Sequence, residues 1–185
     1  MSDLCCTFID SPVGKLFLAG THGALTELRF ASRLDPEHPG RTWPNSGEPF
    51  REAIRQLHAY FAGELKAFDL PLDPGGTPFQ QTVWNALRKI PYGTFISYKE
   101  LAVRVNKPGA HRSVGAANGK NPISIIIPCH RVIGSDGQLT GYGGGLEAKR
   151  FLLELEGAIE PLDGGDCVNK NKKGHFRTFS SAPRQ

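Results

Sequence analysis

The sequence predicts a two-part protein, in which a small α/β domain with an antiparallel sheet and a helix precedes a mostly α domain with a helix-turn-helix. Three short apolar runs near the N-terminus are separated by turn-forming residues, as in a sheet of short strands. A stretch rich in proline and glycine follows at residues 70–76, which we expect to be a linker. Two capping-box sequences and a tight glycine-containing turn then indicate consecutive short helices.

The first part of the chain carries the strand pattern. The apolar runs cover residues 4–9, 15–20 and 23–30. Their joints, residues 10–14 and 20–23, are rich in turn formers, so we expect a three-stranded antiparallel meander. Residues 31–49 contain four prolines and little periodicity, which predicts a long surface loop. A helix is expected over residues 50–63, with one face formed by Ile54, Leu57, His58 and Phe61.

The second part begins with a helix that Thr77, Pro78 and Gln80 open as a capping box. We expect it to reach Ile90, with a core stripe of Phe79, Val83, Leu87 and Ile90. A second capping box at residues 97–100 predicts a helix to about Val105. The turn at residues 106–109 and a further helix over 110–119 complete the helix-turn-helix.

The helix at residues 110–119 combines small side chains with flanking basic ones. Small residues allow close approach to another surface, and basic residues match phosphates. Between residues 98 and 131 there are six basic residues and one acid. The helix lacks the long polar side chains of a major-groove reader, which favours sequence-tolerant binding in the minor groove. Packing against the protein's own core, with a solvated basic face, is the alternative.

Residues 125–132 are the most informative stretch. Three isoleucines at 125–127 predict a buried strand that Pro128 must end, because proline has no N–H to donate to a neighbouring strand. Cys129 and His130 follow at once, and a base beside a thiol can generate the nucleophilic thiolate. Buried cysteines are more often structural, and adjacent side chains on a strand point to opposite faces, so this pair alone is a weak signal.

The remaining segments complete the predicted layout. A glycine-rich loop at residues 140–145 contains Tyr142 and precedes a helix over 146–156 that Gly157 ends. The tail from residue 160 has few large aliphatic side chains, and we expect it to be flexible. The predicted domains are residues 1–73 and 74–159, followed by the tail at 160–185.

Composition excludes several classes of protein. We expect neither a membrane span nor a secretory signal, because no apolar run is long enough. The four cysteines lie at positions 5, 6, 129 and 167, without the Cys/His spacing of a zinc site. We therefore expect reduced thiols, no bound metal and a cytoplasmic protein.

Four segments together resemble one known family. They are Pro128-Cys129-His130-Arg131-Val132, Arg112-Ser113-Val114-Gly115-Ala116-Ala117-Asn118, Asn121-Pro122 and Gly141-Tyr142-Gly143-Gly144-Gly145. This pattern is similar to the O6-alkylguanine-DNA alkyltransferases, and most similar to the bacterial Ogt-type proteins. The resemblance covers residues 76–157. The N-terminal half resembles the family in length and strand pattern, which implies a ribonuclease-H-like domain there.

The resemblance implies direct reversal of DNA damage. Such proteins bind duplex DNA through the helix-turn-helix, flip an alkylated guanine out of the stack and transfer the O6-alkyl group to one cysteine. O4-methylthymine is a further candidate substrate. Each molecule reacts once and needs no diffusible cofactor, because its thiol is consumed. We expect the protein to act on double-stranded DNA as a monomer.

Residue roles follow from the matched positions. Cys129 is the nucleophile, His130 takes its proton through a water, Glu156 holds the imidazole, and Tyr98 gives a proton to the leaving guanine. From its place late in a helix alone, Glu156 would face solvent, and Tyr98 would pack on the core. The implied DNA-binding residues are Arg112, Ser113, Ala116, Ala117 and Lys120, of which Arg112 fills the base stack or, alternatively, contacts a phosphate.

Three further residues are expected to form the alkyl pocket, namely Ser124, Tyr142 and Gly143. Asn121 is expected to support the site by tying the helix-turn-helix to the active-site strand. Ser124 and Gly143 occupy positions where some relatives carry bulkier residues, so we hypothesise a pocket that accepts alkyl groups larger than methyl.

Two other functions remain open from the sequence. The first is an alkyltransferase-like protein that recognises alkylated DNA without repairing it, although those relatives lack the cysteine. The second is a cysteine hydrolase that uses Cys129, His130 and Glu156 and turns over repeatedly. Such an enzyme would have no use for the helix of small residues at 110–119.

Overall fold

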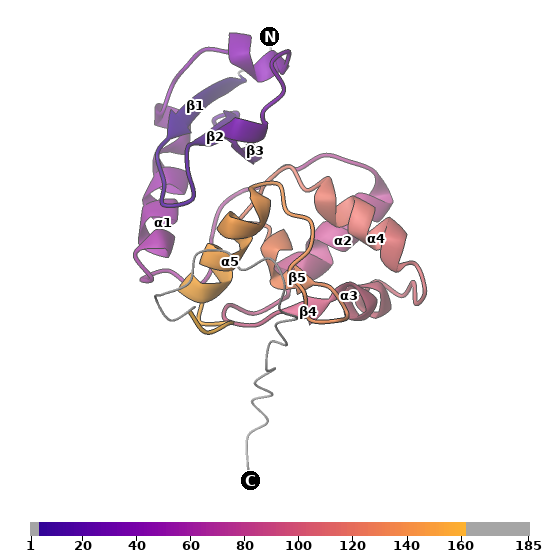
Figure 1. Ribbon diagram of the computed structural model, residues 1–185. Helices are drawn as coiled ribbons and strands as arrows, with labels where there is room; N and C mark the ends of the chain where they lie inside the picture. Colours follow the sequence, from indigo (N-terminus) through magenta and orange to yellow (C-terminus); the bar gives the residue numbers. More distant parts are fainter. Residues whose placement is uncertain (1–3, 162–185) are drawn as a thin grey trace.

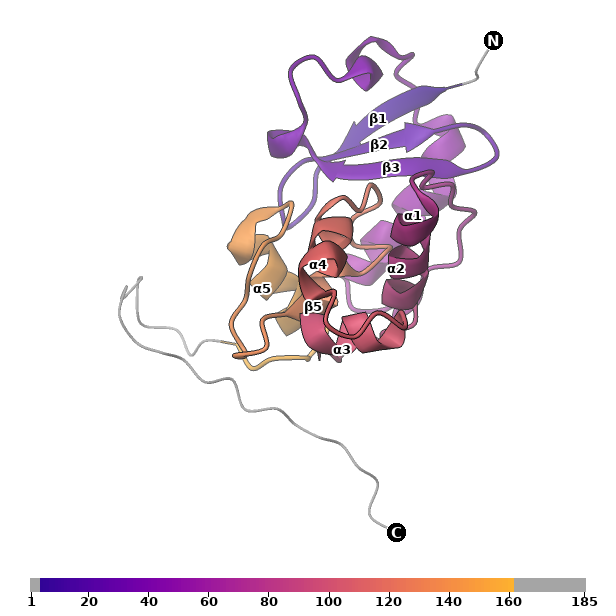
Figure 2. The same cartoon turned by 90° about the vertical axis from the view of Figure 1, so that its right-hand side faces the viewer.

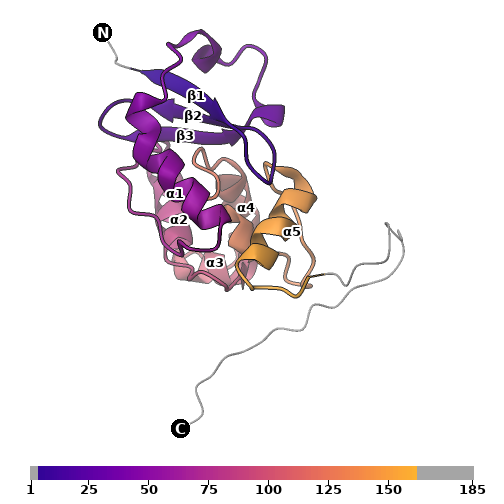
Figure 3. The same cartoon turned by 90° about the vertical axis from the view of Figure 1, so that its left-hand side faces the viewer.

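The computed structural model describes residues 4–161 (Figure 1). A three-stranded sheet forms one layer, and the helices of the second part of the chain lie beneath it (Figure 2). Helix α1 runs from the sheet along the side of the molecule towards α5 (Figure 3). No helix in this range is long and apolar enough to cross a membrane. From residue 162 onward the predicted flexible tail, with Cys167, lies outside the described residues.

The predicted meander is confirmed. Strands β1 (Cys5–Ile9), β2 (Leu16–Gly20) and β3 (Leu25–Phe30) pair antiparallel in the order β1-β2-β3. Every residue of the central strand is buried, because Leu16 and Leu18 face the main core while Phe17 and Ala19 join a second cluster on the other face. An all-apolar strand suits a position that is covered on both faces.

Residues 31–50 cover the outer face of the sheet. They form three short 3₁₀ turns at Ala31–Arg33, Pro39–Thr42 and Glu48–Phe50. Trp43 packs against the second cluster, and Cys6 exchanges backbone hydrogen bonds with Pro44 and Ser46. The segment predicted as a long loop is therefore a cover attached to the edge of β1.

Helix α1 (Arg51–Phe61) is where predicted, and Ile54, Leu57 and Phe61 of its predicted face pack on the core, but His58 does not. The buried residues are Ala53, Gln56, Leu57 and Tyr60, whereas His58 is exposed and Ile54 and Phe61 are half-buried. The polar Gln56 is buried because its amide donates to the Asp69 carbonyl and accepts from the Asp69 N–H, at 2.9 Å each. A fully paired amide is as well placed in the interior as an apolar side chain.

Strand β3 joins the two parts of the chain. Leu25 donates to the Pro71 carbonyl and accepts from Asp73, so the predicted linker is held at the sheet. Further along the strand, Leu28 donates to the Pro122 carbonyl at 2.9 Å and accepts from the Ser124 N–H at 2.8 Å. One hydrophobic core runs through both parts, from the inner face of the sheet to the helices below.

The helices of the second part confirm the capping predictions. They are α2 (Pro78–Arg88), α3 (Tyr98–Arg104), α4 (His111–Gly119) and α5 (Gly145–Leu155). Both capping boxes are formed, at Thr77 and Ser97. The turn between α3 and α4 has positive φ at Asn106 and Gly109, as a tight helix-turn-helix requires. Two strands not foreseen, β4 (Ile96–Ser97) and β5 (Val132–Ile133), pair in parallel.

The strand predicted at Ile125–Ile127 is wrong. These residues are buried, but they form a turn, and Ile125 has a φ of 71°. Asn121 closes this turn, because its amide oxygen accepts from the Ile123 N–H at 3.0 Å and its Nδ2 donates to the Ile127 carbonyl at 2.8 Å. Local hydrogen bonds with the Asn121 side chain therefore override the strand preference of β-branched residues.

Candidate active site

Cys129 opens a 3₁₀ turn, Cys129–Arg131, directly after Pro128. Its side chain is buried, and Nδ2 of Asn121 lies 3.1 Å from its sulfur. The same Nδ2 holds the carbonyl of Ile127, so Asn121 both fixes the turn and donates to the sulfur. Asn121, which is predicted only as a structural support, therefore also contacts the thiol directly.

The environment of Cys129 keeps the thiol protonated at rest. Burial raises the pKa of Cys129, while the hydrogen bond from Asn121 and the positive charge of Lys149 act in the opposite direction. A thiol with a raised pKa needs a base to become a nucleophile. The donor at 3.1 Å and the nearby ammonium group would stabilise the thiolate once it forms.

His130 is the base that the structure offers. Its ring is completely buried, and Nε2 lies 2.8 Å from Oε1 of Glu156. Nδ1 has no hydrogen-bond partner among residues 4–161. Burial lowers the pKa of His130, and Glu156 only partly offsets this, so the resting imidazole is neutral. With its proton on Nε2 towards the carboxylate, Nδ1 is the basic nitrogen.

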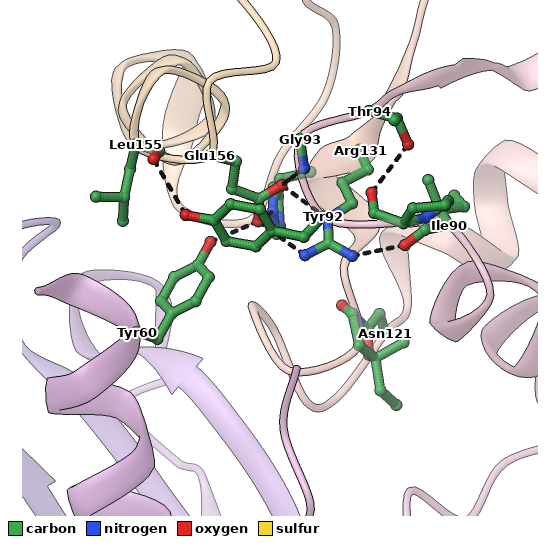
Figure 4. A network of polar contacts seen from close by, with 12 residues as sticks. Tyr60, Ile90, Tyr92, Gly93, Thr94, Asn121, Arg131, Leu155 and Glu156 are labelled. Carbon is green, nitrogen blue, oxygen red and sulfur yellow. Dashed lines mark hydrogen bonds and ion pairs between the residues drawn. The ribbon is translucent and has the colours of Figure 1, made fainter. Parts of the chain in front are cut away.

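Glu156 caps the C-terminus of α5 and is buried, which corrects the solvent-facing position that its sequence context alone predicts. Arg131 donates two hydrogen bonds to the carboxylate, from Nε to Oε2 at 2.8 Å and from Nη2 to Oε1 at 2.9 Å. Tyr60 donates a third, to Oε1 at 2.7 Å (Figure 4). Burial alone would raise the pKa of Glu156, but His130 and Arg131 lower it to about 2. The carboxylate of Glu156 is therefore ionised at neutral pH.

Arg131 does not belong to the basic surface expected between residues 98 and 131. Its side chain is 8% exposed, and Nη1 donates to the Ile90 carbonyl at 2.6 Å while the rest of the guanidinium pairs with Glu156. The other basic residues of that segment are exposed: Lys99, Arg104, Lys107, Arg112 and Lys120. The positive surface thus consists of residues on α3, on α4 and next to them.

A cavity of about 80 Å³ lies over Cys129. All three predicted pocket residues, Ser124, Tyr142 and Gly143, line it together with the cysteine. The Tyr142 ring lies edge-on to Phe30 at 5.5 Å and to His130 at 6.2 Å. The cavity is therefore closed on one side by the glycine-rich loop and on another by the turn before Pro128.

Two buried polar atoms in the cavity wall have no hydrogen-bond partner among residues 4–161, namely Oδ1 of Asn118 and the hydroxyl of Tyr142. Such atoms suit the polar edge of a planar base. Tyr98 stands 3.5 Å from Nδ2 of Asn118, and burial raises the pKa of this tyrosine, so its hydroxyl keeps its proton. Tyr98 is thus joined to the cavity through Asn118.

The predicted DNA-binding residues divide into two groups. Arg112, Ser113, Ala116 and Lys120 are exposed on α4 or at its end. Ala117 is only 4% exposed, and its carbonyl accepts from Nε1 of Trp84 at 2.9 Å. The side chain of Ala117 therefore packs in the core and offers little surface for a direct contact with DNA.

Sequence reasoning missed several residues at this site. Lys149 is completely buried and donates to the carbonyls of Val132 (2.6 Å) and Thr140 (2.7 Å), which joins the turn after Cys129 to the glycine-rich loop. Burial lowers its pKa to about 8. From the N-terminal part, Arg29, Phe30 and Arg33 line the cavity, and Tyr60 reaches Glu156. No local pattern marks these residues, because only the tertiary fold brings them to the site.

Two protein-family models match the chain. The model for the ribonuclease-like domain of 6-O-methylguanine DNA methyltransferase matches residues 4–74, and the model for its DNA-binding domain matches residues 78–158. A methylated-DNA–protein-cysteine methyltransferase of Mycobacterium tuberculosis is 56% identical over 156 residues, which are 84% of this chain and 93% of that protein. The one from Haemophilus influenzae is 48% identical over 179 residues, 95% and 97% of the two chains.

Solved structures agree with these matches. The crystal structure of Mycobacterium tuberculosis O6-methylguanine methyltransferase has a TM-score of 0.78 and 54% identity, covering 86% of this chain and 96% of that one. The structure of Mycobacterium tuberculosis OGT in complex with DNA has a TM-score of 0.77 and 54% identity, covering 83% and 92%. The predicted fold class is confirmed, and the chain belongs to the 6-O-methylguanine DNA methyltransferase family, as an Ogt-type member.

Proposed function

We propose that this protein repairs DNA by direct reversal, moving the alkyl group of O6-alkylguanine to Cys129 in a single, self-inactivating turnover. The observation that carries the proposal is the buried thiol in the wall of a cavity, with Asn121 on its sulfur and with the next residue, His130, paired to Glu156. The relatives in the family are named methylated-DNA–protein-cysteine methyltransferases. O4-methylthymine is a second substrate to test.

The proposed reaction is an in-line displacement at the alkyl carbon. The Cys129 proton passes through a water to Nδ1 of His130, and the thiolate forms a carbon–sulfur bond as the carbon–oxygen bond breaks. The electron pair of that bond goes to O6 of guanine, and Tyr98 donates a proton to the purine. The products are a thioether and an unmodified base, so no diffusible cofactor or metal is required.

The charged groups around His130 would support the proton transfer. Glu156 holds Nε2–H and stabilises the imidazolium that forms, as the acid does in other Cys-His-acid sets. Arg131 fixes both carboxylate oxygens and keeps Glu156 ionised. Asn121 would stabilise the developing thiolate by its hydrogen bond to the sulfur.

DNA binding is assigned to the exposed face of α4. Arg112 would enter the base stack as the damaged nucleotide leaves, offsetting part of an unstacking cost of a few kcal/mol. Ser113, Ala116 and Lys120 are accessible for backbone contacts, and the small side chains allow close approach in the minor groove. Ala117 would act indirectly, by seating the helix on Trp84.

Three organisational proposals accompany this function. We propose that the domains comprise residues 1–73 and 74–159 and are followed by a tail at 160–185. The protein acts as a monomer on one lesion. A cytoplasmic location suits its chemistry, since a thiol reagent needs reducing surroundings.

The test is intact mass after mixing the protein with a duplex that carries one O6-methylguanine, followed by peptide mapping. We expect one methyl group per protein, located on Cys129, and no further reaction. Cys129→Ala should bind the duplex but gain no mass. Lesion-selective binding without added mass in the unaltered protein would favour the recognition-only function. If the protein neither gains mass nor binds DNA, the result would favour a hydrolase.

A further inference from the structure

Tyr60 brings a hydroxyl group from the first half of the chain into the catalytic group. It lies near the end of α1, is completely buried, and donates to Oε1 of Glu156 at 2.7 Å across 96 residues of sequence. Figure 4 shows Tyr60 and Arg131 approaching the carboxylate from different sides. The proton transfer described above makes no use of this contact.

The direction of the Tyr60 hydroxyl is fixed by its ring. The ring packs against Phe68 at 5.2 Å, Phe61 at 5.5 Å and Tyr92 at 6.2 Å between centroids. Burial and the neighbouring carboxylate raise the pKa of Tyr60 far above its ordinary value. The hydroxyl therefore keeps its proton, and towards Glu156 it acts as a donor.

Oε1 of Glu156 is shared by three donors. The Tyr60 hydroxyl lies at 2.7 Å, Nε2 of His130 at 2.8 Å and Nη2 of Arg131 at 2.9 Å. Each donor takes up part of the negative charge on this oxygen, which weakens the attraction of the carboxylate for a proton on the imidazole. Loss of one donor would strengthen the hold of Glu156 on a protonated His130.

We propose that Tyr60 is a positioning residue for alkyl transfer, whose hydrogen bond to Oε1 limits the basicity of Glu156 and so keeps His130 neutral and able to accept the thiol proton. The inference rests on the proposed function, because it takes His130 to be the base. It also gives the N-terminal half a part in the chemistry, in addition to packing.

The direction of the expected effect follows from charge. Without the Tyr60 hydroxyl, Glu156 becomes more basic and stabilises the imidazolium more, so the pKa of His130 rises. Transfer needs neutral His130, so the rate begins to fall at a higher pH on the acid side. A residue that only supported the fold would lower the rate without moving this acid limb.

The experiment measures the single-turnover rate of methyl transfer between pH 5 and 9, with the full chain and saturating duplex that contains O6-methylguanine. Tyr60→Phe removes only the hydroxyl. Tyr92→Phe is the matched control, because Tyr92 belongs to the same aromatic cluster but donates to the Leu155 carbonyl. We expect Tyr60→Phe to move the acid limb up by about 0.5–1 pH unit, and Tyr92→Phe to leave it in place.

A second variant reverses the sign. Replacement of Tyr60 alone by 3,5-difluorotyrosine provides a stronger hydrogen-bond donor and should move the acid limb to lower pH. This variant tests the proposal even if Tyr60→Phe does not fold. Folded variants with an unmoved limb would overturn the positioning role while leaving repair intact. No methyl transfer by the unaltered protein at any pH would instead overturn the proposed function, and this inference with it.

Discussion

Arg112 lies in the first turn of α4, on its exposed face, and it could contact DNA in two ways. As a phosphate contact it would act through its charge, which Lys shares. As a filler of the base stack it would act through its planar guanidinium, which Lys lacks. The two roles therefore predict different results for a conservative substitution.

We expect Arg112→Lys and Arg112→Ala both to lower the extent of base flipping, because neither side chain can stack in place of the displaced base. Arg112→Lys should keep the salt dependence of DNA binding, whereas Arg112→Ala should reduce its slope by about one. Fluorescence of a base analogue beside the lesion reports flipping, and titrations at several salt concentrations report the slope. Full repair by Arg112→Lys would identify a phosphate contact.

Ser124 tests the size of the alkyl pocket. It is buried in the cavity wall, and its backbone N–H is fixed by the Leu28 carbonyl, so a larger side chain would extend into the cavity. We expect the unaltered protein to repair O6-butylguanine and O6-methylguanine at rates within about tenfold of each other. Ser124→Val should slow butyl transfer about tenfold more than methyl transfer. A strong methyl preference in the unaltered protein would contradict the roomy pocket.

At the scale of elements, the glycine-rich loop and β3 form one contact. A Cβ on Gly144 would overlap the ring of Phe30, and the same ring packs edge-on against Tyr142. The glycine is therefore needed for close approach, since its own backbone conformation is an ordinary helical one. Strand β3 thus positions the loop that closes the cavity.

Gly144→Ala should lower the free energy of unfolding by about 1–3 kcal/mol, because the added methyl group must displace a buried ring. Gly143→Ala is the matched comparison for stability: a Cβ there meets nothing within 4 Å, so a change below about 0.5 kcal/mol is expected. Urea unfolding of both variants measures the difference. Equal stabilities would show that the Phe30 ring moves aside without lowering the free energy of unfolding.

The same elements show how far sequence carries the prediction. Local chemistry determined the two capped helices and the turn between α3 and α4, and it predicted them correctly. The turn at Ile125–Ile127 was missed, because hydrogen bonds from Asn121 outweigh the strand preference of isoleucine. Glu156 was placed only by resemblance, since its partner Tyr60 is 96 residues away. Contacts of this kind leave no periodic signal in either segment.

At the scale of the whole molecule, the His130–Glu156–Arg131 group makes stability depend on pH. The pKa of Glu156 is lowered from its ordinary value of 4.5 to about 2, so its contribution is complete above about pH 4.5 and is lost as pH falls towards 2. His130 is held neutral, and its pKa is lowered by burial, so protonation of the unfolded chain below about pH 6.5 acts in the same direction. Acid therefore weakens the fold through one buried cluster.

We expect the free energy of unfolding to fall between pH 6.5 and 3, with Glu156 contributing on the order of 3 kcal/mol to the full loss by pH 2. Glu156→Gln should be much less stable than the unaltered protein at pH 7, because Arg131 is left buried without its partner. This difference should shrink as the pH approaches 3, since Glu156 is then partly protonated in the unfolded chain. Glu64→Gln, an exposed change just after α1, should retain the pH dependence of the unaltered protein. Urea unfolding at each pH measures all three, and a gap between Glu156→Gln and the unaltered protein that is independent of pH would place the acid sensitivity elsewhere in the molecule.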